Sequence, residues 1–67
     1  MNELTNIDIK MIRFIADGLM GKEIAGLIGK TEPTTDTYRT RLLRKTGTKN
    51  APHLISWAYR NGVLTVN

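Results

Sequence analysis

Apolar residues recur three and four positions apart through most of this chain, and glycines interrupt the pattern at intervals. That spacing places them on one face of a helix. In the first stretch the face carries Ile9, Ile12, Ile15, Ala16 and Leu19, with Met11 and Phe14 beside it. Thr5 followed by Asp8 forms a capping pair at its start, and Gly18 stops it in a left-handed conformation. The pattern predicts a helix over residues 6–17.

Three further helices follow from the same signals. Residues 21–28 have an apolar side of Ile24, Ala25, Leu27 and Ile28 and stop at Gly29, although Met20 offers no capping oxygen. Residues 32–46 begin at the cap Thr31, hold Pro33 in the first turn and stop at Gly47. Residues 51–61 begin at the cap Asn50, stop at Gly62 and have an apolar side of Leu54, Ile55, Ala58 and Tyr59. We expect Val63 and Leu64 to fold back onto the core, and Thr65–Asn67 to fray.

The predicted fold is therefore all-α, a four-helix bundle that forms a single domain over residues 1–67. No strand-like alternation and no internal repeat competes with this interpretation. The chain has no cysteine and one histidine, so a disulfide or a conventional zinc site is excluded and no cofactor is expected. No apolar run approaches the roughly 20 residues of a membrane span, and the N-terminus does not resemble a signal peptide. We expect a cytoplasmic protein without a membrane partner.

The positive charge is concentrated in one segment. Residues 30–50 contain six of the ten basic residues and only two acids, which accounts for the whole net charge of +4. A localised basic face on a helix is typical of proteins that bind polyanions. A solvated basic face without a partner is the plain alternative. No nucleophile with a base and no phosphate-binding loop accompanies it, so the sequence does not predict an enzyme.

Two short helices joined by a tight turn, with the second one basic, form a helix-turn-helix pattern. The chain resembles a LuxR-type (GerE-type) DNA-binding domain over Leu4–Leu64. The shared residues are Leu4-Thr5, Ile15-Ala16-Asp17-Gly18, Lys22-Glu23-Ile24-Ala25, Thr31 with Thr34, Lys45 to Asn50, and Ala58 to Gly62-Val63-Leu64. Thr34 to Arg39 is similar to the subset found in two-component response regulators. The resemblance implies an output domain with a receiver domain upstream, acting on DNA and RNA polymerase.

The chain departs from the family at several positions. Ile7-Asp8 stands where Arg-Glu is usual, and Met20-Gly21 stands where Ser-Asn is typical. Thr35 and Thr46 replace a valine and a leucine. A buried leucine-to-threonine exchange costs about 1–3 kcal/mol unless the hydroxyl is bonded. We therefore expect a marginal core.

The resemblance implies that the helix over 32–46 enters the major groove of double-stranded DNA. Asp36, Thr37 and Thr40 would face base edges, with Arg41 nearest the groove. Asp36 either accepts from a cytosine amino group or stabilises the helix dipole by about 0.3–1 kcal/mol. Backbone phosphates would be bound by Lys22, Thr34, Tyr38, Arg39, Arg44, Lys45, Lys49 and Asn50. For Tyr38, packing against the second helix is an equal alternative.

The resemblance further implies a homodimer on two half-sites, paired through the fourth helix by Leu54 and Trp57. For Trp57, a place at the edge of the core is equally consistent with the spacing. The expected function is thus sequence-specific DNA binding in bacterial transcription regulation. Two alternatives remain: a basic helical module that docks an acidic protein, and a non-specific architectural DNA binder.

Overall fold

The computed structural model describes residues 4–66, and these residues form four helices without a strand. The helices are α1 (Asn6–Ala16), α2 (Gly21–Ile28), α3 (Glu32–Thr46) and α4 (Ala51–Arg60). The predicted all-α class is confirmed, and so are the bounds of α2 and α3. The predicted helices over 6–17 and 51–61 each end one residue early, because Asp17 and Asn61 already leave helical geometry. No helix in the described part is long and apolar enough to span a membrane.

The predicted caps are present in the structure. The Thr5 hydroxyl accepts from the Asp8 N–H at 3.1 Å, and the Asp8 carboxylate accepts from the Thr5 N–H at 2.9 Å. Thr31 and Asn50 cap α3 and α4 through their side-chain oxygens. At α2 no side-chain oxygen of Met20 caps the first turn, but the Glu23 carboxylate accepts from the Met20 N–H at 3.0 Å. These bonds satisfy amides that a helix start leaves free.

Two glycines in the left-handed conformation determine where the chain turns before and after α3. Gly29 ends α2 at φ +70°, and Gly47 ends α3 at φ +69°. In each case the next residue donates its N–H to the carbonyl five positions back: Lys30 to Ala25, and Thr48 to Leu43. This bond turns the chain sharply, as in a Schellman motif. The turn between α2 and α3 is therefore only three residues long, which gives the predicted helix-turn-helix. Gly18 and Gly62 also have the predicted positive φ.

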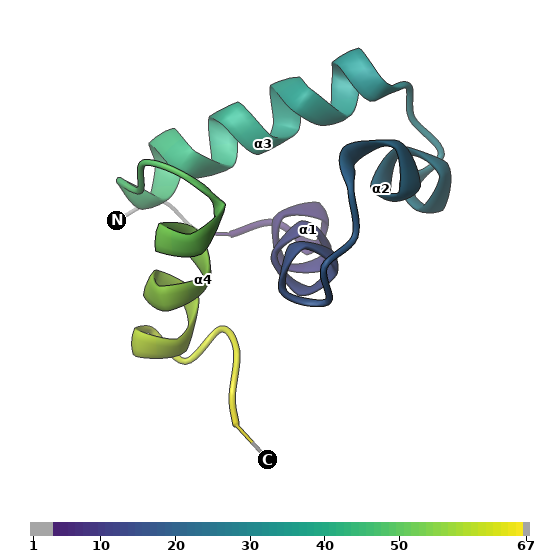
Figure 1. Ribbon diagram of the computed structural model, residues 1–67. Coiled ribbons are helices and arrows are strands. Elements are labelled where there is room, and N and C mark those ends of the chain that lie inside the picture. Colours follow the sequence, from purple (N-terminus) through teal and green to yellow (C-terminus); the bar gives the residue numbers. More distant parts are fainter. Residues whose placement is uncertain (1–3, 67) are drawn as a thin grey trace.

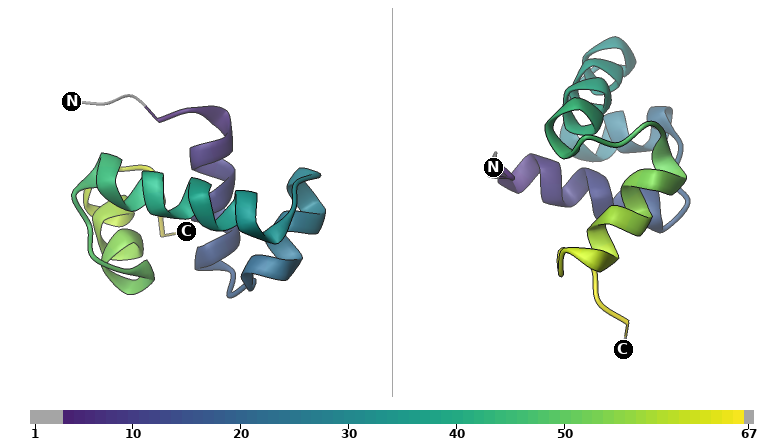
Figure 2. Two further views of the ribbon diagram at one scale, coloured as in Figure 1. Left: turned by 90° about the horizontal axis from the view of Figure 1, so that it is seen from above. Right: turned by 90° about the vertical axis from the view of Figure 1, so that its left-hand side faces the viewer.

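The core lies around α1, which contacts each of the other three helices. Its fully buried members are Met11, Ile12, Ile24, Leu42, Leu54 and Ala58. Figure 1 shows α3 lying across the other helices, with α4 and α2 on opposite sides of α1; the view from above in Figure 2 agrees. Val63 and Leu64 pack against this core, as predicted.

Three predicted core positions need correction. Ala16 is exposed, and the buried face of α1 is centred on Met11 and Ile12 instead. Leu27 is 62% exposed and Tyr59 is 46% exposed. Apolar residues occupy more than one side of these helices, so the period alone does not identify the side that packs inward.

The hydroxyl groups of Thr35 and Thr46, which replace apolar residues of the family pattern, are hydrogen-bonded. Thr35 is fully buried and donates its hydroxyl to the Thr31 carbonyl at 2.9 Å. Thr46 donates to the Leu42 carbonyl at 2.9 Å and lies 2.9 Å from the Thr48 hydroxyl. A bonded hydroxyl avoids most of the cost of burying a polar group. The condition under which these replacements are tolerated is therefore met.

Candidate nucleic-acid interface

One side of α3 is buried and the opposite side is free. Thr35 and Leu42 are fully buried on the inner side. Successive residues are about 100° apart around a helix, so the side of α3 opposite Thr35 and Leu42 can be identified from the sequence numbers. The residues on that opposite side form an exposed sector: Asp36, Thr37, Thr40, Arg41 and Arg44. The structure thus brings together the four residues expected to read bases, with Arg44 beside them.

Polar groups on this face are partly committed to the helix itself. The Thr37 hydroxyl donates to the Pro33 carbonyl at 3.1 Å, which leaves its oxygen lone pairs and methyl group facing outward. Thr34 is half-buried, and its hydroxyl accepts from the Thr31 hydroxyl at 3.0 Å. Asp36 keeps 69% of its side chain exposed. The face therefore offers one carboxylate, two guanidinium groups and the hydroxyl and methyl groups of two threonines to a ligand.

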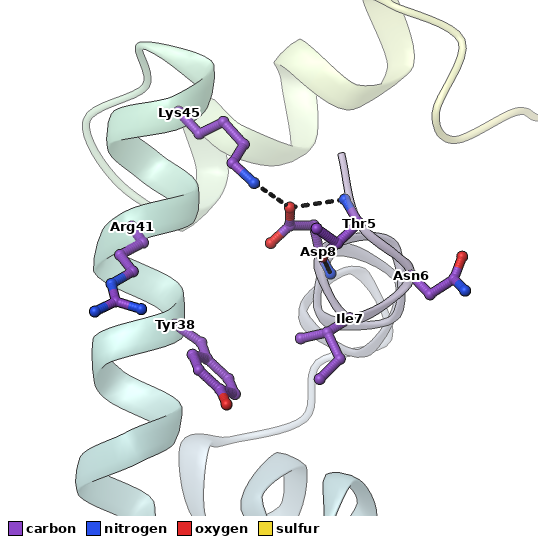
Figure 3. A pocket seen from close by; sticks show the side chains of 7 residues that line it. All are labelled: Thr5, Asn6, Ile7, Asp8, Tyr38, Arg41 and Lys45. Carbon is purple, nitrogen blue, oxygen red and sulfur yellow. Dashed lines mark hydrogen bonds and ion pairs between the residues drawn. The ribbon is translucent and has the colours of Figure 1, made fainter. Parts of the chain in front are cut away.

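One flank of α3 faces the start of α1. There an open cavity of about 490 Å³ is lined by Thr5, Asn6, Ile7, Asp8, Tyr38, Arg41 and Lys45. In Figure 3 the Tyr38 ring points toward Ile7, whereas Arg41 points away from α1. Tyr38 also packs against the core. Its ring thus faces the start of α1 and belongs to the edge of the core, which also contains Ile24 of the second helix.

Lys45 and Asp8 form an ion pair across this flank. The distance between Lys45 Nζ and Asp8 Oδ2 is 2.6 Å, and only 25% and 12% of the two side chains are exposed. The same carboxylate oxygen accepts from the Thr5 N–H, so the pair extends the capping box of α1 (Figure 3). Lys45 was expected to bind phosphate, but here its ammonium neutralises a carboxylate of its own chain.

The environment of Asp8 changes its acidity. Burial by itself raises the pKa of the Asp8 carboxyl, but hydrogen bonds from Lys45 and Thr5, together with the Lys45 charge, hold that pKa below its usual value of 3.8. A carboxyl whose pKa is lowered by folding stabilises the fold above its unfolded pKa, and this contribution is lost as the pH falls through the folded value.

Asp8→Asn is therefore expected to lower the free energy of unfolding by about 1–2 kcal/mol at neutral pH, because Lys45 loses its counter-charge while the cap oxygen remains. Below pH 3.8 the difference between the two proteins should shrink as Asp8 becomes protonated. Urea unfolding followed by circular dichroism at a series of pH values measures this. Asp17→Asn, at the exposed end of the same helix, is the control and should change stability by less than about 0.5 kcal/mol. A constant difference down to pH 2 would contradict the assignment.

The other flank of α3 faces the start of α2. Arg39 Nη2 lies 4.0 Å from Asp36 Oδ1, and its Nε is buried without a hydrogen-bond partner in the described part. A Cβ at Gly21 would lie 3.1 Å from Arg39 Nη2. The glycine at this departure from the family pattern therefore leaves room for the guanidinium, whose side chain is 37% exposed. Lys22, next along α2, is exposed.

The start of α4 carries the last two expected phosphate ligands. Lys49 and Asn50 are exposed, and the Asn50 side chain accepts from the His53 N–H at 2.9 Å. The His53 ring also takes part, because its Nδ1 accepts from the Lys49 N–H at 3.1 Å. This role of His53 in stabilising the turn before α4 was not predicted from the sequence. Its position at the third residue of a capped helix was the only available signal.

The two residues expected at a dimer contact, Leu54 and Trp57, differ in their burial. Leu54 is fully buried, so its side chain belongs to the core and cannot contact a second copy, which corrects that expectation. Trp57 is half-buried and packs at the edge of the core. The exposed aromatic residue of α4 is Tyr59.

Comparison with known proteins gives a consistent assignment. Residues 2–58 match the family model described as bacterial regulatory proteins, luxR family. The chain is 35% identical over 65 residues to the uncharacterized response regulatory protein YgeK of Escherichia coli K12, covering 97% of this chain and 44% of that protein. It is 33% identical over 60 residues to the virulence factors putative positive transcription regulator BvgA of Bordetella pertussis, covering 90% and 29%.

A third relative is the probable transcriptional regulator ycf29 of Porphyra purpurea, 33% identical over 61 residues, which cover 91% of this chain and 29% of that protein. The chain thus spans less than half the length of these relatives. No solved structure matches significantly. The matched region contains α1, α2 and α3 completely, including the turn and the exposed face of α3. Fold and comparison agree that this chain is a helix-turn-helix domain that belongs to the luxR family of bacterial regulatory proteins.

Proposed function

We propose that the domain binds double-stranded DNA sequence-specifically, with α3 in the major groove. The observation that carries this proposal is the division of α3 into a packed inner side and an exposed polar sector. Because Thr35 and Leu42 anchor the helix in the core, the outer side chains are presented on a rigid support. The major groove admits one helix, and its base edges display distinct donors and acceptors.

Within this arrangement, Asp36, Thr37, Thr40 and Arg41 contact base edges. The phosphate backbone on both walls of the groove is bound by residues around this face, which fixes the position of α3 along the DNA. These residues are Lys22, Thr34, Tyr38, Arg39, Arg44, Lys49 and Asn50. Lys45 joins them only if a phosphate replaces Asp8 as its partner. The exposure of Lys22, Arg44 and Lys49 supports their role.

On DNA, pairing of two domains through the outer side of α4 would match a site with two half-sites. Trp57 is our candidate contact, because its ring is half-buried in the single chain. The names of two relatives, a response regulatory protein and a transcription regulator, support an upstream receiver domain and an effect on RNA polymerase.

A binding selection tests the proposal. The domain is equilibrated with a random duplex library at about 150 mM salt. At this salt concentration, charges that lie more than roughly 8 Å apart interact only weakly, so non-specific attraction to phosphates is reduced. We expect an enriched motif, with inverted half-sites about 34–36 Å apart if two domains pair. Lys10→Ala, which removes a charge from α1 and none from α3, should enrich the same motif. Binding without enrichment would favour an architectural role, and no binding would favour an acidic protein partner.

A further inference from the structure

Leu27 is an apolar side chain of α2 that lies outside the buried face of this helix. Ile24 and Ala25 bury the inner side of α2, whereas Leu27 keeps 62% of its surface exposed. An exposed leucine alone is ordinary, and only a larger apolar surface around it indicates a binding site. Its surroundings therefore decide whether it has a role.

Leu27 lies at the edge of a groove between α1 and α2. The groove has a volume of about 380 Å³ and is lined by Ile7, Lys10, Arg13, Phe14, Leu27 and Ile28. Ile7, Lys10 and Phe14 are three and four residues apart, so they follow one side of α1. The lining thus combines four apolar side chains with two cations.

The α1–α2 groove is separate from the proposed DNA-binding face. No residue of α3 lines it, and α4 packs on the opposite side of α1 (Figures 1 and 2). A partner seated there would leave the exposed sector of α3 uncovered. Any function of this groove is therefore additional to DNA binding.

The charge of the groove has one sign. No carboxylate lines it, and neither Lys10 nor Arg13 lies within 4.0 Å of a carboxylate in residues 4–66. Both side chains belong to exposed residues, so their charges can be reached by a partner. An apolar floor flanked by two cations is complementary to an apolar helix face edged with carboxylates.

We propose that the α1–α2 groove docks an acidic amphipathic helix of a protein partner. Apolar anchors of that helix cover Leu27, Phe14 and Ile28, and its carboxylates pair with Lys10 and Arg13. DNA is a poorer match, because phosphates gain nothing from the apolar floor. A second copy of this chain is also a poorer match, since it carries a net charge of +4 and would bring cations to Lys10 and Arg13.

A designed peptide tests this proposal with the 67-residue chain. The probe is a fluorescein-labelled peptide of about 16 residues, with leucine at i, i+3, i+4 and i+7 and glutamate on the flanks. Anisotropy gives the dissociation constant, and amide chemical shifts locate the site. We expect micromolar binding with shifts at α1 and α2, and at least tenfold weaker binding of a scrambled peptide. Leu27→Ala should weaken binding by about tenfold or more, equivalent to 1.4 kcal/mol.

A charge exchange supplies the decisive control. The double variant Lys10→Glu with Arg13→Glu should lose tenfold or more in affinity for the glutamate peptide, and a lysine-flanked peptide should restore it. Thermal unfolding of each variant confirms that it remains folded. The proposal is overturned by no binding, by equal binding of the scrambled peptide, or by shifts confined to α3. It is also overturned if the same shifts arise from self-association without peptide.

Discussion

Leu42→Ala is expected to lower the free energy of unfolding by about 2–5 kcal/mol. Leu42 is fully buried and joins α3 to the core formed by the other three helices. A core in a domain of this size rarely supplies more than about 3–5 kcal/mol. A large fraction of the variant should therefore be unfolded at room temperature, with loss of helical circular dichroism and a lower urea midpoint.

Leu27→Ala is the matched control, because it removes the same atoms from a side chain that is 62% exposed. It should change the free energy of unfolding by less than about 0.5 kcal/mol. Similar losses in the two variants would contradict the core as described. A folded Leu27→Ala protein also validates the peptide-binding experiment, in which the same variant should lose affinity.

Arg41→Ala is expected to reduce affinity for the selected DNA motif by about 1–3 kcal/mol and to relax base preference at one position. Arg41 is exposed on α3, and its side chain points away from α1 (Figure 3). A guanidinium that binds a base edge loses a contact which only the preferred base provides. Repeating the selection with the variant measures preference at every position of the motif.

Arg44→Ala removes the same charge from the same helix and is the matched control. As a phosphate contact, it should weaken all sequences about equally and lower the slope of log affinity against log salt by about 0.9. Arg41→Ala should change that slope less. If both variants left the base preference intact, Arg41 would be a phosphate ligand and the assignment of the reading face would fail.

Local signals in the sequence were sufficient for the four helices and, to within one residue, for their ends. The hydroxyl of Thr31 and the amide oxygen of Asn50 cap the helices that they were predicted to cap. The positive φ of Gly29 and Gly47 was likewise expected from their place after each apolar pattern. These features were predictable because each depends on bonds between residues at most five positions apart. The exposed sector of α3 followed from the same helical period.

The side on which each helix packs was less predictable. Ala16, Leu27 and Tyr59 each continue an apolar pattern, yet all three are exposed. Their helices carry more apolar residues than one contact with a neighbour can cover. Which of them are buried depends on the angles at which α1, α2 and α4 meet, and a single-helix pattern does not contain those angles.

The sequence by itself determined an all-α chain of four helices, three of them with side-chain caps, a helix-turn-helix and a basic exposed face on the second helix of that motif. Only the tertiary structure decided that Lys45, 37 residues from Asp8, pairs with that carboxylate, that Leu54 belongs to the core, and that α1 and α2 enclose a groove beside Leu27. The physical reason is the range of the interactions. Caps and turns are set by neighbouring residues, whereas ion pairs and grooves between helices exist only after the helices have packed.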